Sequence, residues 1–209
     1  MKKQHDIRID RSKLHPHLDR KLTKLLDACA KKGIYLIITE GFRTKEYQDK
    51  LYAQGRTKPG SIVTNARGSS YSSLHMWGIA FDIAINDTNL LYNSKYIQSV
   101  AHIAKTKDIN LGWGGDWKSL KDTPHFYLKG WGDTTAKLKK TYGTPDKFIK
   151  TWTKVTKSVN VPFWKEKTKK NKIGTLGKGK RVEVLYTKGV WCYVKYNNKF
   201  GYIKKGFLK

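Results

Sequence analysis

The stretch "SSLHMWGIAFDIAI", residues 72–85, constrains the fold of this chain more than any other feature. The chain contains 43 lysines and arginines, yet none lies between Arg67 and Lys95. An apolar run bounded by polar loops predicts a strand that is buried in a hydrophobic core. This stretch nevertheless contains one imidazole and one carboxylate, and their presence requires an explanation.

The two groups are His75 and Asp82. In a strand that begins at Ile79, Asp82 shares its face with two alanines, because side chains alternate between the faces. Gly78 permits a sharp turn, so that His75 on the preceding loop folds over the same face. A buried carboxylate without a partner is unfavourable, so the pattern predicts a bound cation. The alternative is a helix cap or salt bridge for Asp82, with His75 as an ordinary core histidine.

Downstream, "KDTPHFYL" supplies His125 just before another apolar strand. Two imidazoles and one carboxylate are the protein ligands of many catalytic zinc sites, in which a fourth position is left for water. The sequence therefore predicts a zinc site formed by His75, Asp82 and His125.

Two further charged residues fit hydrolysis at such a site. Asp122 precedes His125 by three residues, and Pro124 favours extended backbone between them. Asp122 can therefore face the reacting water as a general base. Arg43, in "TEGFRT", follows the end of a predicted strand, where a cation can stabilise an oxyanion.

Periodicity along the chain predicts an α+β domain over residues 1–150, a linker at 151–158 and a small all-β barrel at 159–209. Cys29 and Cys192 are expected to be buried thiols without a disulfide. Two helices are expected to begin at Pro16 and at Thr44, and two more are expected to cover residues 94–107 and 133–141. The expected strands of the first domain cover residues 34–39, 79–85 and 125–128.

The formal net charge of +27 is unevenly distributed. Residues 1–150 contain 27 basic and 14 acidic side chains, whereas residues 151–209 contain 16 and 2. Such a field attracts polyanions, either nucleic acid or the teichoic acids of a bacterial wall. No apolar run reaches the roughly 18 residues of a membrane span. The N-terminus lacks the apolar stretch of a signal peptide, so synthesis and initial retention in a host cytoplasm are expected.

Other aromatic and imidazole side chains have ordinary interpretations. Trp113 and Trp117 either line a substrate groove or cover a core, and the sequence leaves both roles open. His102, within a predicted helix, is expected to pack or to lie on the surface. The polar N-terminal segment predicts solvent exposure for three histidines, His5, His15 and His17.

A family resemblance rests on five residues, Ser73, His75, Gly78, Ala80 and Asp82. They match every defined position of the Ser-x-His-x-x-Gly-x-Ala-x-Asp motif of the VanY-type metallopeptidases. The surrounding "GFRTKEYQDKLYAQGRT" and "LGWGGDWKSLKDTPHF" resemble a narrower branch, the L-alanyl-D-glutamate endopeptidases of phage endolysins and bacterial wall-lytic enzymes.

The resemblance covers about residues 10–130 and implies zinc on the three predicted ligands, Asp122 as the catalytic base and Arg43 as an electrostatic helper. The dipeptidase branch usually has Glu where Asp122 stands, which argues against D-Ala-D-Ala specificity. The tail resembles bacterial SH3-like wall-binding modules. Their usual Asn-Val-Arg opening is replaced here by "VNVPFWKEK", without the arginine, so the ligand site is expected to differ in detail.

These features predict a zinc-dependent peptidoglycan endopeptidase, with a phage lysin released through a holin pore as the expected type. One alternative is a carboxypeptidase that trims D-Ala ends. The other is a basic nucleic-acid-binding protein without enzymatic activity, which would bind DNA in a strongly salt-dependent way. The sequence does not identify the target bacterium, the ligand of the tail or an oligomeric state.

Overall fold

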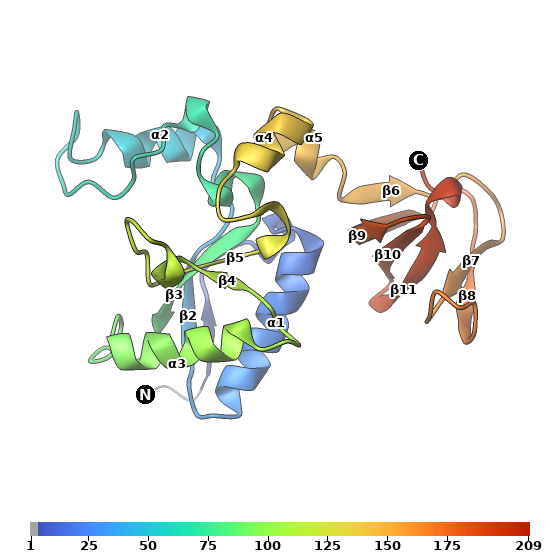
Figure 1. Ribbon diagram of the computed structural model, residues 1–209, viewed down its shortest axis with the longest axis horizontal. Helices are drawn as coiled ribbons and strands as arrows, with labels where there is room; N and C mark the ends of the chain where they lie inside the picture. Colours follow the sequence, from blue (N-terminus) through green and yellow to red (C-terminus); the bar gives the residue numbers. More distant parts are fainter. Residues whose placement is uncertain (1–3) are drawn as a thin grey trace. The chain divides into compact units, whose positions relative to one another are not determined.

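The computed structural model describes residues 4–209 and divides the chain into two compact units, Met1–Asp146 and Lys147–Lys209 (Figure 1). Residues 1–3, at the start of the segment in which no signal peptide is expected, lie outside the described part. Within the described residues, no helix is both long enough and apolar enough to cross a membrane.

The first unit is built on a five-stranded sheet in the order β1-β2-β3-β5-β4. The β1 strand pairs with β2 in parallel, and the other neighbours are antiparallel. The central strand β3 is buried on both faces, as Phe81 and Ala84 show, so the stretch without lysine or arginine forms the middle of the core. The strands are β1 (Asp6–Ile7), β2 (Leu36–Glu40), β3 (Ala80–Ile85), β4 (Gly112–Trp113) and β5 (His125–Tyr127).

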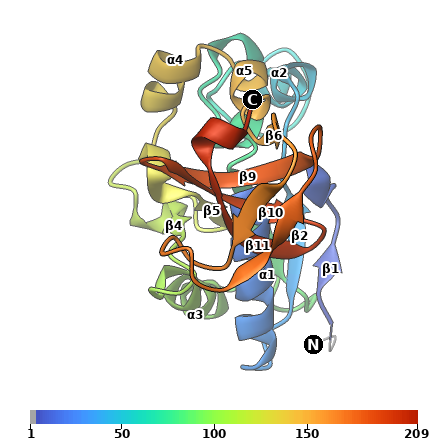
Figure 2. The same cartoon turned by 90° about the vertical axis from the view of Figure 1, so that its right-hand side faces the viewer.

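Helices surround this sheet, which confirms the α+β class (Figures 1 and 2). The α1 helix buries leucines at helical spacing and packs against α3, which also contacts β3 and β4. Thr44 caps α2, because its side chain accepts a hydrogen bond from the Tyr47 amide at 3.2 Å. The helices of this unit are α1 (Pro16–Ala30), α2 (Lys45–Ala53), α3 (Ser94–Lys105) and α4 (Ala136–Tyr142), and α5 (Pro145–Ile149) spans the boundary between the two units.

The expectation that the N-terminal histidines are solvent-exposed is wrong. His15 is only 4% exposed and caps α1, where its Nδ1 accepts a hydrogen bond from the His17 amide at 3.1 Å. His5 is half-buried, and its ring hydrogen-bonds the Leu36 amide and the Leu26 carbonyl. A neutral imidazole can form hydrogen bonds with backbone groups while its ring packs in the core, so the polar composition of the segment did not indicate exposure. His102 is exposed on α3, as expected.

Acid is expected to destabilise this cap. Burial, with a smaller contribution from His17, lowers the pKa of His15 to about 3. The pKa of His15 in the folded protein lies below its unfolded value of about 6.5. The contribution of neutral His15 to folding stability is therefore complete above pH 6.5 and is lost as the pH falls toward the folded pKa. In metal-free protein, His15→Asn, which keeps a capping oxygen, is expected to reduce the acid-induced loss at pH 4.5 by about 2 kcal/mol. Urea unfolding at pH 7.5 and 4.5 measures this, and an identical loss in both proteins would contradict it.

The second unit is an antiparallel six-stranded sheet in the order β6-β9-β10-β11-β7-β8. Its core includes Val161, Phe163 and Ile203, and Asn197 and Asn198 adopt positive φ angles in the turn between β10 and β11. Cys192 is buried here and Cys29 in the first unit, and both are free thiols, as expected. The strands are β6 (Thr153–Val155), β7 (Val161–Trp164), β8 (Lys172–Leu176), β9 (Arg181–Lys188), β10 (Trp191–Tyr196) and β11 (Lys199–Lys204).

The segment 151–158, expected as a linker, is an ordered part of the second unit. It contains β6, which pairs with β9, and Trp152 is buried. The Thr156 side chain donates a hydrogen bond to the Gly177 carbonyl at 2.6 Å. Thr153 is exposed and Lys154 is half-buried in this short edge strand, so its composition resembles that of a linker although its backbone is paired.

Candidate active site

The register of three neighbouring strands brings polar side chains into one row. Asp82 on β3 lies directly opposite His125 on β5 and Glu40 on β2. Residues in directly opposed positions project from the same face of a sheet. Figure 1 shows β2, β3 and β5 side by side. The sheet therefore carries Glu40, Asp82 and His125 in a line.

His75 reaches this row from a 3₁₀ turn, Leu74–Trp77, that ends where Gly78 adopts a φ of +63°. Only a residue that tolerates the left-handed region allows so sharp a return into β3. The His75 Nδ1 atom lies 2.7 Å from the Gly41 carbonyl oxygen, so Nδ1 carries the proton and donates it there. The Nε2 lone pair therefore points toward Asp82 and His125, in the orientation that metal-binding histidines adopt.

Three atoms converge: His75 Nε2, Asp82 Oδ1 and His125 Nδ1. The two nitrogens are 3.1 Å apart, and the carboxylate oxygen lies 3.2 Å from His75 Nε2 and 2.9 Å from His125 Nδ1. Atoms that bind one tetrahedral ion at about 2.0–2.1 Å are roughly 3.3 Å apart. The observed triangle is close to this size, and its donor set fits a metal ion.

The surroundings of His125 and Asp82 favour the protonation states in which these side chains bind a metal ion. Burial lowers the pKa of His125, so its ring is neutral at physiological pH. Burial alone would raise the pKa of Asp82, but the neighbouring His75 and a hydrogen bond from His125 outweigh it and hold that pKa well below its usual range. A neutral His125 ring and an ionised Asp82 carboxylate are the forms in which these two groups bind metals.

Arg43 follows β2 and contacts this cluster directly. Its Nη2 lies 3.4 Å from Asp82 Oδ2, and its Nε lies 3.3 Å from Glu40 Oε2. Its backbone amide donates to the His75 carbonyl at 3.2 Å. The guanidinium therefore bridges two carboxylates and orients the one that belongs to the triad. Sequence reasoning missed Glu40, although its position three residues before Arg43 was a detectable signal.

Asp122 lies on the loop before β5 and lines the same pocket as the triad and Arg43. Its amide donates to the Gly114 carbonyl at 3.2 Å, and a Cβ on Gly114 would lie only 2.4 Å from the Asp122 carbonyl oxygen. Gly114 is thus needed for the close approach that places Asp122. Desolvation by the surrounding pocket residues and the charge of Asp82 raise the pKa of the Asp122 carboxyl, which makes it a better proton acceptor.

An open pocket of about 820 Å³ contains the predicted residues and is rimmed by apolar side chains. The exposed rim residues Ile62 and Val63 come from the loop after α2, and Leu120 comes from the loop before β5. Sequence reasoning did not identify this rim, because exposed apolar residues on loops have no periodicity. The site residues among its lining are Arg43, His75, Asp82, Asp122 and His125.

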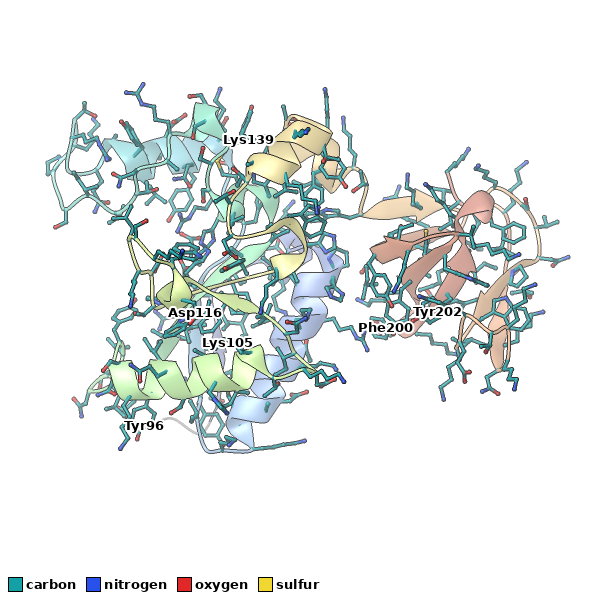
Figure 3. All side chains as sticks on the ribbon, in the orientation of Figure 1. Tyr96, Lys105, Asp116, Lys139, Phe200 and Tyr202 are labelled. Carbon is teal, nitrogen blue, oxygen red and sulfur yellow. The ribbon has the colours of Figure 1, made fainter. Side chains whose placement is uncertain are left out.

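The two tryptophans, whose roles the sequence left open, differ in position. Trp117 lines the pocket, 5.1 Å from the His125 ring centroid. Trp113 instead donates through Nε1 to the Thr123 carbonyl at 2.7 Å and so braces the loop that carries Asp122. An ion pair between Lys105 and Asp116, at 3.1 Å, ties the same loop to α3 (Figure 3).

Gln48 is a second residue that sequence reasoning missed. It is fully buried on α2, and its Nε2 donates to the Ala66 carbonyl at 2.9 Å and to Thr64 Oγ1 at 3.1 Å. Its Oε1 lies 3.5 Å from an Arg43 nitrogen. Gln48 therefore connects the rim loop to Arg43. A buried glutamine on a mostly exposed helix leaves no signal in an amphipathic pattern.

Comparisons with known proteins agree with both units. Residues 67–128 match a model of the M15 peptidase family, described as D-alanyl-D-alanine carboxypeptidase, and residues 165–209 match the bacterial SH3 domain. The chain is 44% identical over 128 residues to the peptidoglycan L-alanyl-D-glutamate endopeptidase CwlK of Bacillus subtilis (strain 168), covering 56% of this chain and 74% of that protein. It is 31% identical over 116 residues to the L-alanyl-D-glutamate peptidase of Listeria phage A118, covering 54% of this chain and 37% of that protein.

Two solved structures are also similar to the chain. The L-Ala D-Glu endopeptidase ChiX of Serratia marcescens aligns with a TM-score of 0.44 at 25% identity, covering 56% of this chain and 82% of that one. The LD-carboxypeptidase LdcB aligns with a TM-score of 0.43 at 26% identity, covering 56% of this chain and 66% of that one.

Proposed function

This chain belongs to the M15 peptidase family, and we propose that it hydrolyses the bond between L-alanine and D-glutamate in peptidoglycan stem peptides. The observation that carries the proposal is the convergence of His75, Asp82 and His125 in a pocket that also contains a carboxylate and a guanidinium. The choice of bond rests on the names of the two relatives, both of which are L-alanyl-D-glutamate peptidases.

We propose that the ion held by His75, Asp82 and His125 is zinc, because two imidazoles and one carboxylate are a common catalytic zinc set. Bound zinc would lower the pKa of a water molecule and polarise the scissile carbonyl. The chain's own groups complete the chemistry. The Asp122 carboxylate accepts the proton of the attacking water and returns it to the leaving amine of D-glutamate.

Arg43 contributes its charge in two ways in this proposal. It orients Asp82 through the 3.4 Å contact, and its positive charge favours the oxyanion that forms on the alanine carbonyl. Trp117 and the apolar rim would displace bulk water around a bound substrate, which would strengthen both effects.

Arg43→Ala is expected to lower kcat by about 10²-fold and to change KM much less, since the charge acts mainly once the oxyanion forms. Arg43→Lys keeps the charge but not the fork that bridges Glu40 and Asp82, so an intermediate kcat is expected. Steady-state kinetics on a soluble stem peptide measure both variants, with Lys50→Ala on exposed α2 as the control. A change confined to KM would assign Arg43 to ground-state binding alone.

The function itself is tested by the products of digestion. Purified peptidoglycan treated with the enzyme should gain new C-terminal L-alanine and new N-terminal D-glutamate, which end-group analysis detects. Release of free D-alanine without these termini would instead identify a carboxypeptidase. Indifference to chelators, together with strongly salt-dependent DNA binding, would identify a nucleic-acid-binding protein.

We propose that the second unit holds the enzyme on its insoluble substrate at the bacterial cell wall. It matches the bacterial SH3 domain, and residues 151–209 contain 16 basic and 2 acidic side chains, which suits anionic wall polymers such as teichoic acids. The proposed route is synthesis in a host cytoplasm followed by release to the wall. Cell fractionation before and after lysis tests this route.

Deletion of residues 147–209 is expected to slow lysis of intact walls by about 10- to 100-fold, because tethering raises the local concentration of the catalytic unit. Cleavage of a soluble stem peptide should stay near normal, since all proposed site residues lie in Met1–Asp146. Turbidity loss of wall suspensions and peptide chromatography give the two rates. Equal losses in both assays would show that the second unit supports catalysis rather than attachment.

A further inference from the structure

A row of aromatic side chains crosses the second unit's sheet. Tyr193 on β10 lies opposite Tyr186 on β9 and Tyr202 on β11, and Tyr202 lies opposite Trp164 on β7. Directly opposed residues share a face, so the row spans four neighbouring strands. Three strand spacings of about 4.8 Å make it roughly 14 Å long. Figure 3 labels Tyr202 and its neighbour Phe200 on this sheet.

The rings form a nearly continuous surface. Tyr193 lies with its ring centroid 5.2 Å from Tyr186, 4.8 Å from Tyr202 and 6.3 Å from Phe200, and its plane is tilted only 25–30° from those of Tyr186 and Phe200. Trp191 contacts Tyr202 at 6.5 Å. We call these five residues, Tyr186, Trp191, Tyr193, Phe200 and Tyr202, the aromatic face.

The aromatic face is the outer side of the sheet. The alternate residues of β10 and β11, such as Cys192, Val194 and Ile203, form the hydrophobic core on the other side. Tyr186 is 38% exposed, and the other four members are half-buried against one another. Large aromatic side chains gathered on an accessible surface mark an interaction site more often than scattered apolar residues do.

Cations stand beside these rings. The ammonium group of Lys167 lies 5.4 Å from the Tyr202 ring centroid, and that of Lys204 lies 5.9 Å from the Trp191 centroid. The Tyr186 and Tyr202 hydroxyls lie 3.0 Å apart and can exchange hydrogen bonds with a ligand. A ligand for this surface therefore needs flat apolar patches, hydroxyl or amide groups and nearby negative charge.

We propose that the aromatic face binds the glycan strand of peptidoglycan, an inference that rests on the proposed function. The C–H bonds on one side of a pyranose ring form an apolar patch that packs against an aromatic ring. Hydroxyl and acetamido groups at the ring edge meet the tyrosine hydroxyls. Each peptide-bearing sugar also brings the carboxylates of its stem peptide, which complement Lys167 and Lys204.

Single-stranded nucleic acid is also bound by surfaces that combine stacking with positive charge. The rings of Tyr186, Tyr193 and Phe200 lie side by side in near-parallel planes. A glycan is the proposed ligand because the proposed function places this unit on peptidoglycan, and single-stranded nucleic acid is an outcome that the test distinguishes. Cross-strand aromatic pairs also stabilise a sheet, so the test must separate stability from binding.

The test uses the full chain and a β-1,4-linked N-acetylglucosamine hexamer, which contains no peptide bond that a stem-peptide peptidase cuts. Titration followed by tryptophan fluorescence is expected to saturate. Tyr193→Ala and Tyr186→Ala should each weaken binding by roughly tenfold. Lys178→Ala, which removes an exposed cation from the turn between β8 and β9, is the matched control and should leave binding unchanged. Thermal unfolding of each variant checks that the second unit remains folded.

The outcomes are distinct. Absence of hexamer binding, or equal binding by wild type and both tyrosine variants, would overturn the proposal. If Tyr193→Ala does not fold, Tyr186→Ala decides, because Tyr186 is the most exposed ring. If the two tyrosine variants lose binding to a single-stranded oligonucleotide but bind the hexamer as the wild type does, the face binds nucleic acid instead. Cleavage of soluble stem peptide should be normal in every variant, and its absence in the wild type would refute the proposed function while leaving hexamer binding testable.

Discussion

Replacing His125 by alanine is expected to abolish both tight zinc binding and peptidase activity. His125 supplies one of three converging atoms, 2.9 Å from the Asp82 oxygen and 3.1 Å from the His75 nitrogen. Two remaining ligands would hold the ion much more weakly, and loss of a supporting group outside the ligand set alone typically lowers affinity by about 10- to 100-fold. We therefore expect a loss of more than about 100-fold in affinity and no measurable turnover at equimolar zinc.

The measurement is metal content per chain after dialysis, together with hydrolysis of a soluble stem peptide. His75→Ala should behave in the same way, because its Nε2 is held toward the triad by the bond from Nδ1 to the Gly41 carbonyl. His102→Ala is the matched control, since His102 is exposed on α3. Full retention of zinc in both ligand variants would exclude this triad as the metal site.

Sequence reasoning located the triad because its members follow local rules. Asp82 and His125 stand on predicted strands, where alternation assigns each side chain to a face, and Gly78 marks the turn that returns His75. The contacts of Arg43 could not be predicted in the same way. They depend on the register between β2 and β3, which shifts at an irregularity between Ile38 and Glu40, and no local pattern specifies such a shift.

The sequence was least informative where polar residues are buried or paired. His15 and Gln48 lie inside the first unit because each forms hydrogen bonds there, and composition does not reveal a satisfied polar group. The β6 strand could not be predicted from the sequence for a related reason. It is an edge strand of only three residues, Thr153–Val155, which is too short to show an alternating pattern. Its neighbour Trp152, an aromatic residue within a polar segment, was the available signal.

Asp122→Asn is expected to fold, to bind zinc normally and to lose activity by about 10²- to 10⁴-fold, the usual contribution of a general base. The amide has almost the same shape as the carboxylate, so the hydrogen bond from the residue 122 backbone amide to the Gly114 carbonyl should persist. What changes is the ability to accept a proton, which the surroundings of Asp122 enhance by raising its pKa. The expected defect therefore lies in kcat and not in metal content.

Two companion variants make this result specific. Asp122→Glu keeps a carboxylate at the end of a longer side chain and should recover part of kcat, whereas a purely structural role would give no such recovery. Asp108→Asn removes an exposed carboxylate that pairs with Lys24 away from the pocket lining and should leave kcat nearly unchanged. Single-turnover kinetics on a soluble stem peptide separate the chemical step from product release. A near-normal rate for Asp122→Asn would require another proton acceptor, and Glu40, in the same row of the sheet but already paired with Arg43, would be the next carboxylate to replace.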